Sequence, residues 1–265
     1  RVVVVRRRRR QMMRLADYTT DEARALLALP KTAALVPVGS VEPHGPHLML
    51  ATDTLIGERA CETAIAVLRA RGVDAVVAPS VPYGVTDYAQ GFAGAVTLPA
   101  AVLSAYLRAV CTGLLGAGFK HVCLVSNHLE PEHDAAVRAS IDGLPDGHAS
   151  VASPLTRRWG RLLSDEYKRG NCHAGRYETS LVLAAKGRVL DVRASLAPID
   201  TSLAAGIKDG HKTFAAMGLD RAYTGDPADA TAEEGEGLFA TLAEMIATEV
   251  TEALDRRGVT IVRDL

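Results

Sequence analysis

The chain is poor in aromatic side chains, in cysteine and in net charge. Of its 265 residues, 5% are aromatic, one is tryptophan and four are cysteine, and the formal net charge is −1. The few aromatics argue against base-stacking surfaces, and the balanced charge argues against a nucleic-acid partner. The four cysteines are widely spaced without a Cys-x-x-Cys pair. This spacing argues against a zinc ribbon and predicts a reducing, cytoplasmic location.

Long apolar runs are also lacking. We see no run of about 18 apolar residues and therefore expect no membrane span. The beginning of the chain lacks the apolar core and cleavage site of a secretory signal, and reads Val2–Val5 followed by Arg6–Arg10. We interpret residues 1–14 as a basic, disordered leader, with a polyanion-binding arm as the alternative. Residues 15–265 are expected to form a single domain with a sizeable core.

Short apolar runs and longer amphipathic segments alternate along the chain. Strands are predicted at Ala33–Val38, Ala75–Ala78, Val122–Val125 and Val151–Pro154. Helices are predicted at Thr54–Arg71, Ala100–Leu115, Glu132–Gly143, Leu155–Tyr167, Thr179–Ala185 and Ala232–Arg257. This alternation predicts an α/β fold, with a mostly parallel central sheet flanked by helices on both faces.

The most informative stretch follows the first predicted strand. It reads Val-Gly-Ser-Val-Glu-Pro-His-Gly-Pro-His over residues 38–47, and Asp53 closes it. Glu42, His44 and Asp53 combine carboxylate oxygen with imidazole nitrogen, the ligand types that zinc and similar divalent metals bind. The end of a strand is also where α/β proteins place their chemistry. Taken singly, His44 could be a turn residue and Asp53 the N-cap of the next helix.

A second polar group follows the predicted strand Val122–Val125. His128 and Glu130 stand two residues apart, so in an extended chain both side chains lie on one face. We interpret both as metal ligands. The next polar residues, 132–134, are interpreted as the first turn of a helix, where acidic side chains suit the helix dipole.

A third group reads Cys-His-Ala-Gly-Arg-Tyr-Glu-Thr-Ser over residues 172–180. His173 and Glu178 stand five residues apart across a glycine turn, so the two could converge on one site. The alternative is a helix start, with Glu178 in the first turn and Thr179 and Ser180 as caps. A nucleophilic pair of Cys172 and His173 is disfavoured, because adjacent side chains point apart.

The three motifs, in this order, resemble those of the creatininase family, the creatinine amidohydrolases. The first and third motifs are complete, whereas the second is altered. Weaker resemblances lie at residues 83–98 and 225–235, and the matches run from about residue 35 to residue 235. The resemblance implies a creatininase-like α/β fold and a homohexamer.

The resemblance also implies two divalent metal ions, with zinc, manganese or iron as candidates. Asp53 matches the ligand that bridges both ions. Glu42 and His128 match the ligands of one ion, and His44 and Glu130 match those of the other. Glu178 matches an acidic residue that is either a ligand or a neighbour of the ligands.

The implied reaction is hydrolysis of an amide C–N bond. Paired metals acidify water and polarise a carbonyl, and a histidine can protonate the departing nitrogen. His173 matches the proton-transferring histidine, for which we expect a pKa near neutrality. Glu178 and Asn127 are candidate acceptors that hold the ligand imidazoles in one tautomer. The resemblance also implies substrate contacts. These are Thr86, at the position of a substrate-contacting serine, and Leu129 and Tyr83, which lie within the matching motifs.

The departures from the family pattern concern the substrate. Creatinine-specific members carry a Trp-Asp pair before the third motif, and Lys168–Cys172 here contains neither. Leu129 replaces an aromatic residue. Trp159, the one tryptophan, is expected to have a packing role, with a position over the site as the alternative. We therefore expect a small lactam, cyclic amide or formamide other than creatinine, and neither nucleic acid nor membrane as partner. The alternatives are a metallopeptidase that trims a small or modified peptide, and a non-catalytic scaffold.

Overall fold

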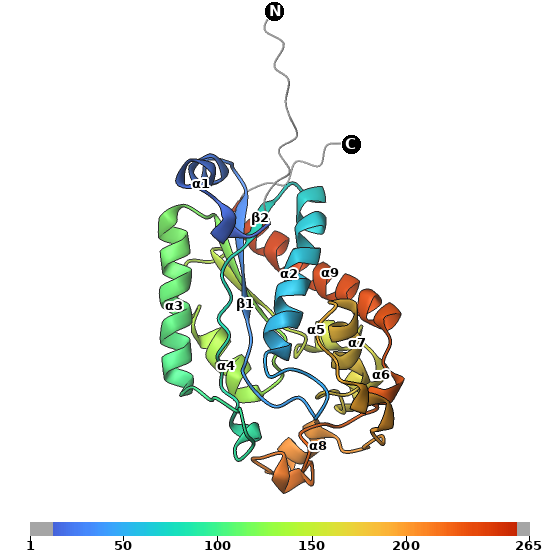
Figure 1. Ribbon diagram of the computed structural model, residues 1–265. Helices are drawn as coiled ribbons and strands as arrows, with labels where there is room; N and C mark the ends of the chain where they lie inside the picture. The colour runs from blue at the N-terminus through green and yellow to red at the C-terminus, as the bar shows by residue number, and fades with distance from the viewer. Residues whose placement is uncertain (1–12, 259–265) are drawn as a thin grey trace, which may run out of the picture.

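A four-stranded parallel sheet forms the centre of the molecule (Figure 1). The computed structural model describes residues 13–258. The strands are β1 (Thr32–Val38), β2 (Asp74–Val77), β3 (His121–Ser126) and β4 (Ala149–Ala152), in the spatial order β2-β1-β3-β4. All three pairings are parallel. The predicted strands and the parallel sheet are confirmed, with bounds shifted by one or two residues.

Helices cover both faces of the sheet because side chains alternate along each strand. Ala33 and Leu35 of β1 belong to the core on the face covered by α2 (Thr52–Ala70), α7 (Arg176–Ala184) and α9 (Ala232–Arg256). Ala34 and Val36 belong to the opposite core, which is covered by α3 (Ala100–Ala117) and α4 (Pro131–Ala139). The helix α1 (Thr20–Leu27) adds Leu26 to this second core. The predicted α/β fold is confirmed.

One predicted helix is wrong. Residues 155–167 do not form a continuous helix but two short ones, α5 (Arg157–Gly160) and α6 (Asp165–Arg169). The break occurs because Ser164 begins a new helix: its side chain accepts a hydrogen bond from the backbone N–H of Tyr167. Trp159 of α5 is buried, and its Nε1 donates to Glu249 of α9 at 2.7 Å. The expected packing role of Trp159 is confirmed.

Helix α3 corrects the expectation about apolar runs. By length and composition alone it is apolar enough to cross a membrane, despite Arg108 in its middle. Such a property is weak evidence, since core helices of soluble proteins share it. Leu103, Leu107 and Cys111 are completely buried against the sheet, whereas Val102 and Tyr106 on the outer face are more than half exposed.

The segment between α7 and α9 lies at the end of the molecule where the strands terminate (Figure 1). It contains α8 (Leu203–Lys208) and the short 3-10 helices η3 (Asp191–Ser195), η4 (Ala215–Met217) and η5 (Pro227–Asp229). Phe214 and Leu219 from this segment pack with Tyr88 of η2 (Asp87–Ala89) in a small separate core.

The predicted leader lies mostly outside the described residues, which begin at residue 13. Arg14, the last residue of that segment, is described, and the 3-10 helix η1 (Leu15–Asp17) follows it. The Arg14 guanidinium forms ion pairs with Glu58 and Glu62 of α2, the second at 2.7 Å. This arginine is therefore attached to the domain.

Candidate metal centre

The parallel sheet brings the first two motifs together. Strands β1 and β3 are neighbours and end at Val38 and Ser126, so the chain that follows each strand lies at the same edge. Glu42 and His44 follow β1, and His128 follows β3. The exposed fraction of each of these three residues is 4% or less. A buried group of ionisable side chains at the carboxyl ends of parallel strands is typical of a functional site.

Two helix starts supply further carboxylates. Asp53 lies in the first turn of α2 and Glu178 in the first turn of α7, and both are buried. Asp53 is not the N-cap of its helix, because Ala51 occupies that position. Thr179 and Ser180 lie inside α7, so the capping roles considered for them are wrong.

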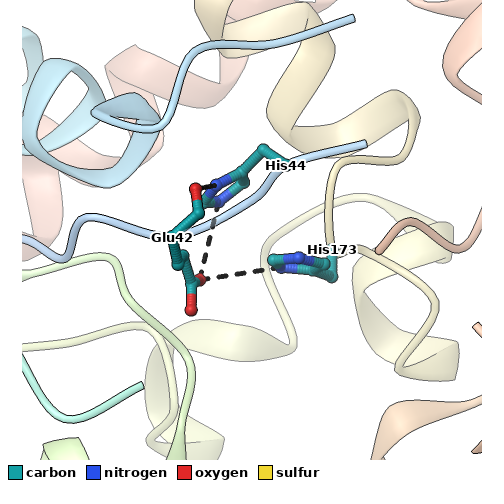
Figure 2. Close-up of side chains that lie close together, drawn as sticks. All are labelled: Glu42, His44 and His173. Carbon is teal, nitrogen blue, oxygen red and sulfur yellow. Dashed lines mark hydrogen bonds and ion pairs between the residues drawn. The ribbon is translucent and has the colours of Figure 1, made fainter. Parts of the chain in front are cut away.

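Glycine 45 allows the first motif to turn back on itself. Its φ of +63° lies in the left-handed region, which side chains disfavour. The Gly45 N–H donates to the carbonyl of Ala222 at 2.8 Å, which attaches the turn to the segment before α9. The bend places His44 beside Glu42 and His173 (Figure 2).

One group of potential ligands consists of Glu42, Asp53 and His128. Nδ1 of His128 lies 3.2 Å from Glu42 Oε1 and 3.1 Å from Asp53 Oδ2. The other ring nitrogen, Nε2, is 2.7 Å from the carbonyl oxygen of Val85. A carbonyl only accepts, so Nε2 carries a proton and donates a hydrogen bond to Val85, which leaves Nδ1 directed at the two carboxylates.

A second group consists of His44, Asp53 and Glu178. Nδ1 of His44 donates to the carbonyl of Glu42 at 3.2 Å. Nε2 is completely buried and has no hydrogen-bond partner within the described residues, yet it lies 3.4 Å from Asp53 and 3.5 Å from Glu178. Both imidazoles are thus held by a backbone carbonyl, the outer support that metal-ligating histidines usually have. The expectation that Glu178 and Asn127 give this support is wrong.

The electrostatics of the two groups favour a positive charge between them. Burial alone would lower the pKa of His44, but Asp53, Glu178 and Glu42 outweigh it and raise this pKa to about 10. Burial would raise the pKa of Asp53, but His44 and His128 hold it well below its usual value. Buried carboxylates need compensating charge, and divalent cations bound by oxygen and imidazole nitrogen supply it. The donor set and the unpartnered Nε2 of His44 therefore fit divalent metal ions.

Glu130 lies apart from His44. Its carboxylate accepts from the backbone N–H groups of Asp87 at 3.0 Å and Tyr88 at 3.3 Å, and lies 3.9 Å from Nε2 of His128. Burial raises the pKa of Glu130 to about 7. The structure thus places Glu178, not Glu130, with His44, which differs from the pairing that the resemblance implied.

His173 lies beside the two groups and lines the cavity, and with Glu42 and His44 it forms a third possible ligand set. Its ring stacks between His44 and Phe214, with ring centroids 4.6 Å and 4.5 Å away. Nε2 lies 3.1 Å from the carbonyl of Pro43 and so carries the proton, which leaves Nδ1 as the acceptor, 3.9 Å from Glu42. Burial and then the charge of His44 lower the pKa of His173 to about 4. The expected pKa near neutrality is wrong, and His173 is neutral at pH 7.

The third motif turns sharply between His173 and Glu178. Ala174 has a φ of +50°, a conformation that costs energy for a residue with a side chain and is often found at functional sites. This conformation directs the Ala174 N–H to the carboxylate of Glu178 at 2.7 Å. Burial raises the pKa of Glu178 to about 8.

A buried glutamate that sequence reasoning missed supports this turn. Glu166 of α6 is 6% exposed and accepts from the N–H groups of Tyr177 at 2.9 Å and Asp226 at 2.8 Å. It therefore joins the third motif to the loop before α9. No local sequence pattern marks Glu166 as important. Both of its partners are backbone N–H groups, and they lie 11 and 60 residues away along the chain.

Cys172 does not provide a nucleophile. Its thiol is buried, and burial raises its pKa well above the usual value, so the thiolate is disfavoured. Cys61 and Cys111 are buried in the two cores, as expected.

A cavity of about 520 Å³ opens from the candidate metal centre. Leu129 lines it, whereas Thr86 and Tyr83 do not, and the substrate contacts of all three stay predictions. Thr86 is buried, and its hydroxyl donates to Glu42. Tyr83 is 45% exposed. The lining residues that sequence reasoning missed include Tyr88, Arg157, Arg161, Ile207 and Phe214.

The fold and the site define an α/β protein with a buried, metal-binding cluster of carboxylates and imidazoles at the carboxyl edge of its parallel sheet. Residues 16–250 match the family model for creatininase, described as creatinine amidohydrolase. The chain therefore belongs to the creatininase family, whose named relatives below are hydrolases of C–N bonds.

Two kinds of relative are similar in sequence. The mycofactocin precursor peptide peptidase of Mycolicibacterium smegmatis is 31% identical over 235 residues, which are 85% of this chain and 87% of the relative. The same peptidase of Mycobacterium tuberculosis is 30% identical and covers 82% of this chain and 84% of its own length. The creatinine amidohydrolase of Pseudomonas putida is 24% identical, over 67% of this chain and 74% of the relative.

Solved creatininase structures share the fold. A manganese creatininase has a TM-score of 0.69 and 21% identity, over 91% of this chain and 98% of that one. A zinc form of a creatininase variant has a TM-score of 0.69 and 20% identity over the same shares.

Proposed function

We propose that this chain is an amidohydrolase that uses two divalent metal ions, zinc or manganese, to cleave a peptide-like amide. The observation that carries the proposal is the convergence of two ligand groups on Asp53, which belongs to both. One group would hold an ion through Glu42 and His128, and the other through His44 and Glu178. Glu130, which lies 3.9 Å from Nε2 of His128, would support the first ion.

When bound, the two cations supply Lewis acidity, which lowers the pKa of a water molecule and polarises a carbonyl. The remaining work belongs to side chains of this protein. The neutral His173 offers Nδ1 as an acceptor and takes a proton from the attacking water. It then returns this proton to the departing nitrogen, so the same ring serves first as base and then as acid. Stacking on Phe214 and the hydrogen bond to Pro43 hold the ring in place.

Three observations favour a substrate larger than creatinine. The cavity of about 520 Å³ has the size of a site for a drug-sized ligand rather than for one small ring. No tryptophan lines it, because Trp159 is buried against α9. The relatives at 30% and 31% identity are named as peptidases. A lactam or formamide is the second candidate, supported by the relative named as an amidohydrolase.

A substrate panel tests the proposal. The purified chain is loaded with zinc or manganese and assayed with creatinine, lactams, formamides and short peptides. We expect hydrolysis of peptides, and two metal ions per chain by elemental analysis. A loaded protein that cleaves none of these, or that binds no metal, would favour the scaffold alternative.

We also propose a hexameric assembly in the cytoplasm. All four cysteines are free thiols, which suits a reducing compartment. The exposed apolar side chains of α3, Val102 and Tyr106, offer a surface for contact between subunits. Light scattering on the purified protein measures the assembly, and a monomer would contradict it.

A further inference from the structure

Three cationic side chains line the cavity away from the metal ligands. Arg157 belongs to α5, Arg161 follows that helix directly, and Lys168 belongs to α6. The Lys168 ammonium forms an ion pair with Asp165 at 3.1 Å. Arg157 and Arg161 have no ion-pair partner within residues 13–258.

The neighbouring arginine shows that this is not a general property of the segment. Arg158 does not line the cavity, and its guanidinium pairs with Glu252 of α9 at 2.6 Å while lying over the Trp159 ring. Arginines of the same short segment are therefore used in two ways. One pairs with a glutamate, and the other two, which are also exposed, line the cavity without an ion-pair partner in the described part of the chain.

The negatively charged residues that line the cavity all belong to the candidate metal centre. They are Glu42, Glu130 and Glu178. Much of the remaining lining is apolar and includes Leu129, Leu155, Leu203, Ile207 and Phe214. A substrate in this cavity would therefore meet a metal-dependent cleavage centre, apolar walls and two unpaired guanidinium groups.

We propose that Arg157 and Arg161 form a subsite for a substrate carboxylate, namely the C-terminal carboxylate of a peptide whose amide bond lies at the metal centre. A guanidinium presents a planar pair of donors that matches a carboxylate in bidentate geometry. A peptide that ends in an apolar residue with a free carboxylate fits both the walls and the two arginines. This inference rests on the proposed function, and it makes the enzyme a peptidase that acts near the C-terminus.

Binding to a variant with strongly reduced turnover tests the subsite with little cleavage of the ligand during the measurement. The full-length His173→Ala variant, loaded with zinc, is titrated by calorimetry with acetyl-Ala-Ala-Leu and with its C-terminal carboxamide. Charge-assisted hydrogen bonds distinguish the two ligands, so we expect the acid to bind about 10-fold more tightly or better. Equal affinity for the two peptides, or no binding of the acid, would overturn the proposal.

Matched arginine variants locate the effect. In the His173→Ala background, Arg157→Ala with Arg161→Ala should bring the acid-to-amide ratio of affinities to about one, whereas Arg158→Ala should leave it unchanged. Metal content and melting temperature are measured for each variant, so that loss of folding is separated from loss of the subsite. If the preference for the acid survives loss of both arginines, the carboxylate binds elsewhere and the proposal is wrong. Inorganic phosphate that binds more tightly than the acid peptide would likewise overturn the assignment to a carboxylate.

Turnover by the zinc-loaded wild-type protein separates this inference from the function on which it rests. Cleavage of the acid and the carboxamide with equal kcat/KM would overturn the subsite and leave the hydrolase intact. Conversely, a preference for the acid in binding, with no cleavage of any amide, would support the subsite and contradict the proposed hydrolysis.

Discussion

The carboxylate of Asp53 extends from the first turn of α2 to within 3.4 Å of Nε2 of His44, a nitrogen that has no hydrogen-bond partner in the described part of the chain. The other oxygen of Asp53 lies 3.1 Å from Nδ1 of His128 and accepts from the Ser40 hydroxyl at 2.6 Å. One side chain therefore belongs to both ligand groups, and Ser40 fixes its orientation.

Replacing Asp53 should affect both metal ions. In Asp53→Ala the ligand common to the two groups is lost, so we expect neither ion to be retained and activity to vanish. Elemental analysis after dialysis measures the metal content, and Asp209→Ala, at an exposed position, is the control. Retention of one full equivalent of metal would show that the two groups do not depend on a common ligand.

The two glutamates should differ in their effects on the ions. Glu178 lies 3.5 Å from His44, whereas Glu130 is held by the N–H groups of Asp87 and Tyr88. Glu178→Gln should therefore lose the ion associated with His44 and keep the other. Glu130→Gln should instead weaken the ion beside His128. Metal titration of both variants measures which ion is lost. If Glu130→Gln lost the ion associated with His44 and Glu178→Gln did not, the pairing that the family resemblance implied would be correct.

His173 should act on turnover and not on metal binding. Removing a positioned general base and acid lowers kcat by roughly 10²- to 10⁴-fold. We expect His173→Ala to show such a loss with an unchanged metal content, and replacement of the exposed His211 to have no effect. Full turnover by His173→Ala would exclude the assigned proton transfer.

The buried His121 should make the stability of the protein depend on pH. Its Nδ1 donates to the Gly147 carbonyl at 3.0 Å and its Nε2 lies 2.8 Å from the Ser150 hydroxyl. Burial lowers its pKa from 6.5 to about 4, so the unfolded chain binds the proton more readily than the folded one. The stability that this difference provides is present above pH 6.5 and is lost as the pH falls to about 4.

The pKa difference of His121 corresponds to roughly 3 kcal/mol of unfolding free energy. Urea unfolding at pH 7 and pH 5 measures roughly 2 kcal/mol of this difference, because pH 5 still lies above the folded-state pKa of about 4. We expect the wild-type protein to lose more stability than His121→Gln over this interval, with His211→Gln behaving like the wild type. Equal pH dependence in wild type and His121→Gln would refute the prediction.

The fold could be predicted largely from local patterns. The apolar runs at β1 and β3 and the period of four along α9 are properties of neighbouring residues, and burial of one face or both follows from them. The failure at residues 155–167 has a local cause as well, because the cap formed by Ser164 competes with continuation of the helix. Amphipathic periodicity does not report such a competition.

The sequence by itself determined the elements, the three motifs and the residue types of the site, because backbone preferences and apolar periodicity act over a few neighbouring residues. Only the tertiary structure decided which carboxylate lies beside His44, which carbonyls hold the two ligand imidazoles, and that Arg157 and Arg161 face the cavity. These relationships join segments that are distant along the chain. They depend on strand order and helix packing, which place residues far apart in sequence within a few ångströms of each other.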